Sequence, residues 1–384
     1  MTTHRSIVDA LSRAAASNES VVLATVVRIT GSSYGGVGAR MVAHVDGSTV
    51  GLVSGGCLET DLAERARQVH ATGRAEVVTY DTRADDDAAW GLGLGCNGLI
   101  DVLLEPLSPD RAAELATLLK RALAAESLAV LATVIESTAV TKSGSMVGAH
   151  ALFTDDSVET TGDWEDNSVL DAIALNVNDA LSAGRRGLTQ TYDAMEVAFE
   201  VITPSVHFVI CGSGPDVVPL VRFAFELGWD VTVVDHRPVA HANPERFPGA
   251  RVVECANALQ LAESVALMPR TCAVVMSHHF GRDTDYVQAL LGAGIGYVGV
   301  LGPRARTERM LSELGSASGT RVAPSSSLFG PVGLDIGGDG PDAIALSIIA
   351  EVSAVAHGRR GEHLRDRDAP LHESPSRAAV TERG

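Results

Sequence analysis

The sequence predicts an α/β protein whose C-terminal part is a doubly wound parallel sheet. Two observations carry this prediction. After Val206, apolar strands alternate with helical segments, and this order is typical of a parallel sheet covered by helices. Before Val206, short apolar strands are separated by Gly-rich loops and a few helices, which indicates a mixed α/β region. A chain of 384 residues is long enough for two or three domains.

The N-terminal region is predicted from its hydrophobic periodicity and its turn residues. Leu62, Ala66 and Val69 recur at helical spacing, and Gly73 stands where such a helix would stop. Pro106 and Pro109 mark a boundary, so we expect a first domain over residues 1–107. Its expected helices cover residues 7–16 and 60–71, and its expected strands cover residues 21–29, 39–45, 49–52, 76–80 and 99–104.

A weak internal repeat follows this domain. The segment VLATVVRITGSS…GARMVAH, residues 22–44, is similar to VLATVIESTAVTKSGSMVGAH, residues 130–150. The second copy keeps the strand pattern, but residues 160–172 contain no counterpart of the SGGC sequence at residues 54–57. We interpret residues 108–204 as a second subdomain and a diverged repeat that completes a sheet. Coincidental similarity between two strands is the alternative.

The C-terminal domain is expected over residues 205–358 as a Rossmann-like sheet. The charged residues 359–384 have little to bury and are predicted to be a disordered tail. The expected strands of the domain cover residues 206–211, 230–234, 251–254, 273–276 and 296–301, and its expected helices cover residues 215–227, 283–291, 304–314 and 341–357.

A glycine turn after the first of these strands is a candidate anion site. Gly212, Ser213 and Gly214 precede a helix that Pro215 can start, so free N–H groups should point toward a ligand. Val217 stands where the dinucleotide-binding fingerprint requires a third small residue. Asp235, about 20 residues further on, fits the position that contacts a ribose. The pattern leaves two interpretations open: a nucleotide-like ligand site, or a Rossmann unit without a ligand.

Two cysteines in Gly-rich segments are candidates for a reactive thiol. Cys57 follows Ser54, Gly55 and Gly56 at an expected helix start, where unpaired N–H groups stabilise a thiolate. Glu59 and Asp61 in the same turn oppose this effect, and an ordinary buried cysteine is the alternative. Cys96, beside Asn97 in the sequence GLGLGCNG, invites the same hypothesis with less support.

Two further groups at expected strand ends are candidate ligand residues. His278 and His279, with Asp283 nearby, could hold a metal, but the favoured interpretation is a capped loop with one hydrogen-bonded histidine. Arg304 and Arg306 could bind a phosphate, and a surface ion pair between Arg304 and Glu308 is the competing explanation. Lys120 and Lys142 are the only lysines, and neither lies in a GxxxxGK[ST] loop, so a P-loop NTPase is excluded.

Composition and charge exclude several classes of partner. With 30 Lys and Arg against 48 Asp and Glu, the chain has a net charge of -18, which repels nucleic acid and anionic lipid. No apolar run approaches the roughly 18 residues that span a bilayer, and residues 1–20 lack the apolar core of a signal peptide. We therefore expect a cytoplasmic protein without nucleic acid or membrane partners. The five cysteines are odd in number and follow no framework or CxxC spacing, so reduced thiols are expected for Cys57, Cys96, Cys211, Cys255 and Cys272.

Six sequence blocks follow one another over nearly the whole chain. They are GSSYGGVGARMVAHVDGSTVGLVSGGCLETDL, GCNGLIDVLLEP, FVICGSGPDVVPLVRFAFELGWDVTVVDHRP, SHHFGRDTDYVQALL, YVGVLGPRARTERML and GLDIGGDGPDAIALSIIAEVSAV. Taken together and in this order, they resemble the XdhC/CoxI family. The resemblance implies an N-terminal XdhC/CoxI domain and a C-terminal Rossmann domain. It also implies that the protein binds molybdenum cofactor, has it sulfurated by a partner cysteine desulfurase, and delivers it to an apo-molybdoenzyme of xanthine dehydrogenase type.

The resemblance assigns candidate cofactor-binding residues but no catalytic residue. Cys57 lies in the most distinctive N-terminal block of the family, and its thiolate would be a suitable soft ligand for the metal. Pro215 and Val217 depart from the family pattern, which bears on nucleotide binding in particular. The candidate residues are Ser54, Gly55, Gly56, Cys57, Glu59, Cys96, Gly212, Ser213, Gly214, Asp235 and Arg304.

Three functions follow from these patterns. The leading hypothesis is a molybdenum cofactor chaperone for maturation of a xanthine dehydrogenase-type enzyme, without turnover of its own. The alternative is an NAD(P)-dependent oxidoreductase that uses Gly212, Gly214 and Asp235. The third is a scaffold without a ligand inside a maturation complex. We also expect a homodimer, because a strand-rich N-terminal half with incomplete layers would leave an apolar face to bury.

Overall fold

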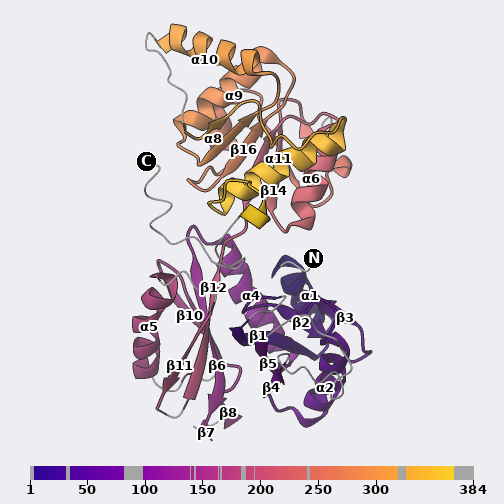
Figure 1. The fold of residues 1–384 in the computed structure, drawn as a ribbon, viewed down its shortest axis with the longest axis vertical. Helices are drawn as coiled ribbons and strands as arrows, with labels where there is room; N and C mark the ends of the chain where they lie inside the picture. Colours follow the sequence, from indigo (N-terminus) through magenta and orange to yellow (C-terminus); the bar gives the residue numbers. More distant parts are fainter. Residues whose placement is uncertain are drawn as a thin grey trace. The chain divides into compact units, whose positions relative to one another are not determined.

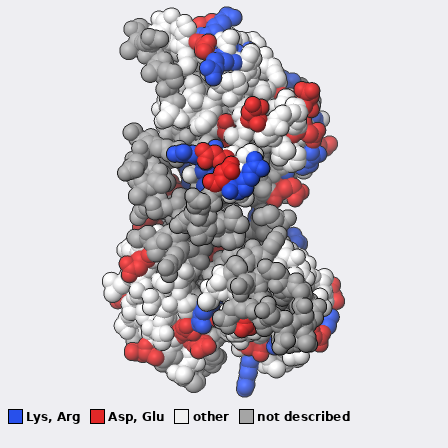
Figure 2. Space-filling view, in the orientation of Figure 1, with Lys and Arg blue, Asp and Glu red and all other residues white. Residues whose placement is uncertain are grey.

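The chain folds into two compact units, which meet in the sequence between Pro204 and Ser205. A computed structural model shows the helices and strands of each unit (Figure 1). On the face drawn in Figure 2, acidic and basic side chains are interspersed within each unit, so the net charge of -18 is not gathered there in one acidic patch. The structure describes residues 4–31, 35–81, 98–138, 140–141, 144–162, 164, 167–182, 187–193, 195–239, 243–318 and 326–366.

The N-terminal unit contains two antiparallel sheets with one shared connectivity. The strand order is β3-β2-β1-β5-β4 in the first sheet and β10-β9-β6-β12-β11 in the second. In each half, one helix precedes the first strand and another lies between the third and fourth strands of the sheet. The two similar sequence segments, residues 22–44 and 130–150, lie over the matching strand pairs β1–β2 and β6–β9.

The described residues of the first half form two helices and five strands. Gly73, in the left-handed conformation with φ of 64°, ends the second helix where the sequence predicts a stop. The last strand runs through Pro106 and ends at Leu107, the residue at which the expected first domain ends. The elements are α1 His4–Ala16, β1 Val21–Gly31, β2 Arg40–Ala43, β3 Thr49–Gly51, α2 Glu59–Thr72, β4 Glu76–Asp81 and β5 Gly98–Leu107.

The second half repeats this arrangement. Its first helix begins at Pro109, and Ser108 caps it by accepting a hydrogen bond from the backbone N–H of Arg111. A short additional hairpin, β7–β8, follows the first strand. The elements are α4 Pro109–Ala124, β6 Ala129–Ser137, β7 Val140–Thr141, β8 Gly144–Ser145, β9 His150–Phe153, β10 Val158–Thr161, α5 Asn167–Ser182, β11 Leu188–Tyr192 and β12 Met195–Ile202.

Helices pack against both faces of each five-stranded sheet in this unit, and both faces are accordingly apolar. Along β1, Val21 and Leu23 pack with α1 and α4, whereas Val22 and Ala24 on the opposite face pack with α2. The second sheet packs against α4 on one face and against α5 on the other. Helices α1 and α4 therefore lie between the two sheets and join the halves through one core (Figure 1).

Two buried polar contacts connect the halves in a reciprocal way. Arg40 of the first half forms an ion pair with Glu200 of the second, and their side chains are 3% and 9% exposed. His150 of the second half lies 3.1 Å from Glu105 of the first. Arg40 and His150 begin the equivalent strands β2 and β9, and the two glutamates lie on the equivalent strands β5 and β12.

The C-terminal unit is a parallel six-stranded sheet with the order β15-β14-β13-β16-β17-β18. The chain proceeds outward from β13 in one direction and then returns to continue from β16 in the other, which places a topological switch point between these two strands. The elements are β13 His207–Cys211, α6 Val217–Glu226, β14 Asp230–Asp235, β15 Arg251–Glu254, α8 Leu261–Ser264, β16 Cys272–Val275, α9 Phe280–Gly292, β17 Tyr297–Val300, α10 Arg304–Ser318, β18 Leu328–Phe329 and α11 Pro341–Ala356.

Helices cover both faces of this sheet, which confirms the predicted doubly wound fold (Figure 1). Phe208 and Ile210 of β13 face α6 and α11, whereas Val209 and Cys211 face α8, α9 and α10. Three single-turn 3₁₀ helices accompany these elements: Pro244–Arg246, Ala258–Gln260 and Leu364–Asp366. The last of them falls within the predicted tail. Of that tail, residues 367–384 lie outside the described residues.

Across the described ranges, no helix has both the length and the hydrophobicity that crossing a lipid bilayer requires.

Candidate functional site

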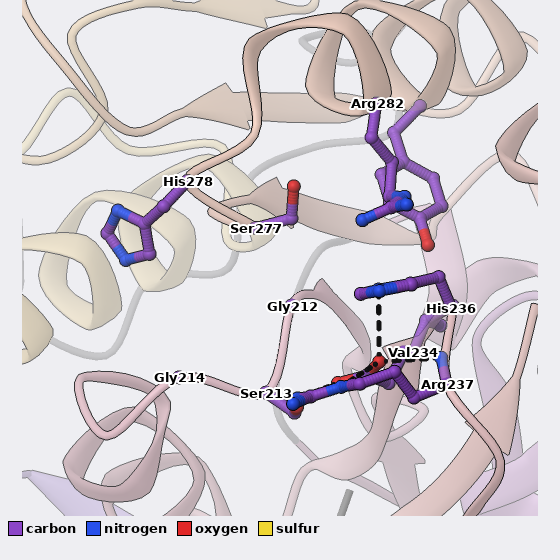
Figure 3. A pocket seen from close by; sticks show the side chains of 11 residues that line it. Gly212, Ser213, Gly214, Val234, His236, Arg237, Ser277, His278 and Arg282 are labelled. Carbon is purple, nitrogen blue, oxygen red and sulfur yellow. Dashed lines mark hydrogen bonds and ion pairs between the residues drawn. The ribbon is translucent and has the colours of Figure 1, made fainter.

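A cavity of about 210 Å³ lies in the C-terminal unit at the carboxyl ends of its central strands (Figure 3). We call it the crevice. It follows β13 and β16, the strands on either side of the switch point, where α/β sheets bind their ligands. Gly212 has φ of 137°, and a Cβ atom there would lie 2.6 Å from the carbonyl oxygen of Met276, so only glycine fits. The lining residues are Gly212, Ser213, Gly214, Val234, Asp235, His236, Arg237, Ser277, His278, Arg282 and Tyr286.

Asp235 is the buried acidic residue of the crevice, at the end of β14. One carboxylate oxygen accepts hydrogen bonds from the backbone N–H of Arg237 at 2.8 Å and from its Nε at 3.0 Å. The other accepts from the Arg237 guanidinium at 2.8 Å and from the Ser213 hydroxyl. Burial alone would raise the pKa of Asp235, but the hydrogen bonds from Arg237 and Ser213 outweigh it and hold the pKa well below its usual value.

These contacts bear on the predicted ribose-binding role of Asp235. Both carboxylate oxygens are already used by Ser213 and Arg237, and His236 Nδ1 lies 3.2 Å from one of them. A ribose hydroxyl could bind Asp235 only after Arg237 had moved away. The role therefore stays a prediction that the observed arrangement of side chains does not favour.

Cationic and neutral donors line the remainder of the crevice. Figure 3 shows Ser213 and Arg237 along one side and Ser277 and Arg282 along the other. Within the described part of the chain, the guanidinium of Arg282 has no hydrogen bond or ion pair. Tyr286, one turn further along α9, is 1% exposed, and its buried hydroxyl has no partner there either. The crevice thus presents two unused donor groups.

The predicted metal site at His278, His279 and Asp283 does not form in this arrangement. His278 Nε2 lies 2.8 Å from Asp216, and His279 Nδ1 accepts a hydrogen bond from the backbone N–H of Arg282 to cap α9. Asp283 accepts hydrogen bonds from Ser277. In the described ranges, no three His, Cys, Asp or Glu side chains gather in a way that could hold a metal ion. His279 instead caps the helix, as the interpretation of a capped loop predicts.

The two candidate arginines after β17, Arg304 and Arg306, have different surroundings. Arg306 forms an ion pair with Asp283 at 2.7 Å and lies over the ring of Phe280, so it fixes the loop that carries Ser277. Arg304 is the exposed first residue of α10 and is not among the residues that line the crevice. The structure therefore brings Gly212, Ser213, Gly214 and Asp235 together, but it does not place Arg304 with them.

The second candidate site is the loop of residues 54–58 in the first half of the N-terminal unit, which we call the Cys57 loop. Glu59, the first residue of α2, anchors it. The carboxylate accepts hydrogen bonds from the backbone N–H groups of Val53 at 2.9 Å and Ser54 at 2.8 Å, and from the Ser54 hydroxyl at 2.8 Å. The Ser54 hydroxyl in turn accepts from the backbone N–H of Leu58. Burial tends to raise the pKa of Glu59, but these hydrogen bonds hold it below its usual value.

The tip of the Cys57 loop presents an exposed thiol. Gly55 and Gly56 have φ of 82° and 112°, a backbone conformation that favours glycine. Cys57 is exposed, whereas Cys211, Cys255 and Cys272 are buried. Burial raises the pKa of Cys211 and Cys255, and it raises the pKa of Cys272 to about 12. Among the described cysteines, Cys57 is therefore the accessible one. Cys96, the other predicted candidate, lies outside the described residues.

Six residues that line the crevice were not identified as candidates from the sequence: Val234, His236, Arg237, Ser277, Arg282 and Tyr286. His236 and Arg237 directly follow Asp235, so this basic pair at the end of the strand could have indicated an anion site from the sequence. Arg282 and Tyr286 are separated by one helical turn, a spacing that places both on one face of α9. The sequence predicts that this helix begins only at Asp283, which left Arg282 in a loop.

Comparisons with known proteins cover both units. The family model for the XdhC Rossmann domain matches residues 208–352, and the model for the XdhC and CoxI family matches residues 14–81. A Bacillus subtilis protein, named as a probable subunit of xanthine dehydrogenase, is 31% identical over 334 residues, which are 87% of this chain and 92% of that protein. The molybdenum cofactor insertion chaperone PaoD of Escherichia coli is 34% identical over 105 residues, which are 27% of this chain and 32% of PaoD.

A solved structure agrees with these matches. The crystal structure of a Bacillus halodurans protein named xanthine dehydrogenase has a TM-score of 0.73 to this chain at 31% sequence identity. The superposition covers 96% of this chain and 99% of the other. Because the similarity extends over nearly the full length of both chains and both family models match in the expected order, this chain belongs to the XdhC and CoxI family and carries the XdhC Rossmann domain at its C-terminal end.

Proposed function

We propose that the protein is an accessory factor that binds molybdenum cofactor and delivers it to a molybdoenzyme of xanthine dehydrogenase type. The observation that carries this proposal is the sequence similarity to PaoD, which is named a molybdenum cofactor insertion chaperone. The relative from Bacillus subtilis, whose name assigns it to xanthine dehydrogenase, supports the class of client enzyme. A carrier of this kind needs a ligand site and a partner surface, and it needs no catalytic residue.

Cys57 supplies a chemical reason for this proposal. Molybdenum in the cofactor is held by a dithiolene and by exchangeable oxo and sulfido ligands, and a thiolate is a suitable soft ligand for such a metal. The thiol is exposed, and the Cys57 loop is held at its base by the hydrogen bonds to Glu59. A cofactor bound at this loop would have its metal close to Cys57 until the client enzyme accepts it.

Two partners complete the proposal. A cysteine desulfurase would supply the sulfido ligand before delivery, and the protein itself would form a homodimer. The homodimer predicts a mass of about twice 40.0 kDa in light scattering at micromolar concentration. A mass near 40.0 kDa would contradict it. Capture of the desulfurase by the purified protein, with and without cofactor, would test the first partner.

The alternative function, an NAD(P)-dependent oxidoreductase, has less support. Its main argument is Asp235, but that carboxylate is already bonded to Arg237 and Ser213. Val217 also occupies the position at which the dinucleotide fingerprint requires a small residue, and it is fully buried against the core. Tight binding of NAD(P)H with turnover of an aldehyde or a hydroxy acid would favour the oxidoreductase over the cofactor carrier.

The test of the proposed function is cofactor retention by the Cys57→Ala variant. The full chain is produced in cells that make molybdenum cofactor, and bound molybdenum and the fluorescent oxidised pterin are measured per protein. We expect near-stoichiometric cofactor in the wild type and a loss in Cys57→Ala with unchanged folding. Cys272→Ala is the matched control, because Cys272 is 3% exposed and lies in the core. We expect this control to lose stability and keep the cofactor. Equal cofactor in Cys57→Ala and wild type would remove Cys57 from the site.

A further inference from the structure

The crevice of the C-terminal unit contains hydrogen-bond donors to which the proposed role of the Cys57 loop assigns no function. We propose that it is a binding site for the phosphate group of a phosphorylated ligand, with Arg282, Tyr286 and the turn of residues 212–214 as the groups that hold the phosphate. The cavity of about 210 Å³ is large enough for a phosphate with part of its substituent. The following contacts carry the proposal.

The charges around the crevice favour an anion. Arg282 lines the cavity, and its guanidinium has no hydrogen bond or ion pair within the described part of the chain. The carboxylate of Asp235 is neutralised by Arg237, and that of Asp216 contacts His278 at 2.8 Å. The proximity of Arg282 adds to burial in lowering the pKa of His236. The guanidinium of Arg282 thus lacks a paired carboxylate in the crevice, and an anion bound beside it would compensate its charge.

Tyr286 is an independent indication of a ligand. Its side chain is 1% exposed, it lines the cavity, and its hydroxyl has no hydrogen-bond partner among the described residues. An unpaired buried hydroxyl is unfavourable, so such a group needs a partner that the protein itself does not supply. Burial raises the pKa of Tyr286, so the hydroxyl stays protonated and can donate a hydrogen bond to an acceptor. A phosphate oxygen is such an acceptor.

The turn of residues 212–214 adds backbone donors. It lies between β13 and α6. The Gly212 N–H donates to the carbonyl oxygen of Val234, so the donors that the turn offers to a ligand, among the described residues, are the N–H groups of Ser213 and Gly214. At Gly214 the nearest atom to an added Cβ would be Asp216 Oδ1 at 2.3 Å, which belongs to a side chain that can rotate, so Gly214 is less constrained than Gly212. Because neither glycine has a side chain, a ligand can approach the backbone closely on this side, while Arg282 reaches it from the other side of the cavity (Figure 3).

The same contacts disfavour a ligand of the NAD type. Recognition of a ribose needs a free carboxylate at the end of the second strand, and Asp235 there is bonded to Ser213 and Arg237. The site therefore selects for the phosphate and not for a ribose. If the proposed function holds, the phosphate is that of the pterin cofactor, in its monoester or its dinucleotide form. This last step rests on the proposed function, whereas the phosphate site does not.

The test is isothermal titration calorimetry of the full chain, purified without cofactor, with inorganic phosphate, pyrophosphate and NAD⁺. We expect phosphate and pyrophosphate to bind and NAD⁺ to give no heat. Stronger binding of pyrophosphate would favour the dinucleotide form, and equal binding would favour the monoester. Arg282→Gln should weaken binding by about tenfold, the equivalent of one charge-assisted hydrogen bond. Arg222→Gln is the matched control, because Arg222 is an exposed arginine of the same unit that pairs with Asp342 outside the crevice.

Tyr286→Phe gives a readout that a structural role would not produce. Removing an unpaired buried hydroxyl should leave the melting temperature unchanged or higher, while phosphate binding weakens by about threefold or more. Equal binding in Arg282→Gln and wild type, or tighter binding of NAD⁺ than of pyrophosphate, would overturn the proposal. If Arg282→Gln loses phosphate binding but still retains molybdenum cofactor in cells, the phosphate site stands and only its link to the cofactor fails.

Discussion

Replacement of Glu59 tests whether its carboxylate holds the Cys57 loop in place. In Glu59→Ala, the N–H groups of Val53 and Ser54 and the Ser54 hydroxyl all lose their acceptor. Hydrogen bonds to a charged group contribute about 1.5–3 kcal/mol each, but three on one half-buried carboxylate are not additive, so we expect a loss of about 2–4 kcal/mol in the free energy of unfolding. Glu59→Gln keeps one carbonyl oxygen for the two backbone donors and should lose about 1 kcal/mol.

The pH dependence of this loss follows from the pKa of Glu59, which folding lowers. A carboxylate with a lowered folded pKa contributes stability above its unfolded pKa of about 4.3, and this stability disappears as the pH falls through the folded pKa. Wild type and Glu59→Gln should therefore differ at pH 7 and converge only after the pH has fallen below the lowered pKa that Glu59 has in the folded state.

Urea unfolding of each variant at pH 7 and at low pH measures both effects, and cofactor retention measured on the same proteins shows whether the loop geometry matters for binding. Glu64→Ala is the matched control on the same helix, because Glu64 is 60% exposed and pairs only with Arg67 among the described residues. Its change should stay within about 0.5 kcal/mol. Unfolding of Glu59→Ala at the wild-type urea concentration would refute the assigned role of the carboxylate.

Three further outcomes are expected. At pH 7, iodoacetamide should label Cys57 before the buried thiols of the folded protein, and peptide mass spectrometry of a Cys96→Ser background shows the order of labelling. Gly212→Ala should lower the free energy of unfolding by about 1–3 kcal/mol and abolish phosphate binding, because φ of 137° suits only glycine and a carbonyl oxygen would lie 2.6 Å from the new Cβ. Urea unfolding measures the loss of stability, and calorimetry measures the loss of binding. Glu200→Gln should lower the free energy of unfolding, measured with urea, by about 3–5 kcal/mol, because Arg40 stays charged and buried without its ion-pair partner. A loss below about 1 kcal/mol would contradict this.

The fold of the C-terminal unit could be predicted from the sequence because its strands are buried on both faces. Segments such as Val209 to Cys211 read as continuous apolar runs, and each ends at a glycine or polar turn. The start of α9 was predicted three residues too late. His279 caps this helix with a ring nitrogen, and histidine is not among the residues that usually signal a helix start. This error concealed Arg282.

The candidate residues of the crevice could be predicted only in part. The turn at Gly212 and the acidic residue Asp235 follow a local spacing that the sequence shows directly. Whether the Asp235 carboxylate is free depends instead on the position of the Arg237 side chain, which also donates to the Ser213 hydroxyl. Ser213 lies 22 positions before Asp235 in the chain, so a local pattern does not show this contact. The spacing of the motif therefore indicates a nucleotide site, while the contacts between its members favour a phosphate.

The two halves of the N-terminal unit show why a repeat in topology does not repeat a site. Both halves keep a glycine two residues before the first residue of the second strand, and the carboxylate of the opposite half lies against it: Glu200 against Gly38 and Glu105 against Gly148. These contacts need only the backbone and a buried acid, so the second half preserves them. At the position of the Cys57 loop, the second half instead has Trp164, whose Nε1 donates to the carbonyl oxygens of His150 and Thr161. A partly buried ring that packs with α5 stands there in place of an exposed thiol, so the second half stabilises the sheet while the first half retains the candidate site.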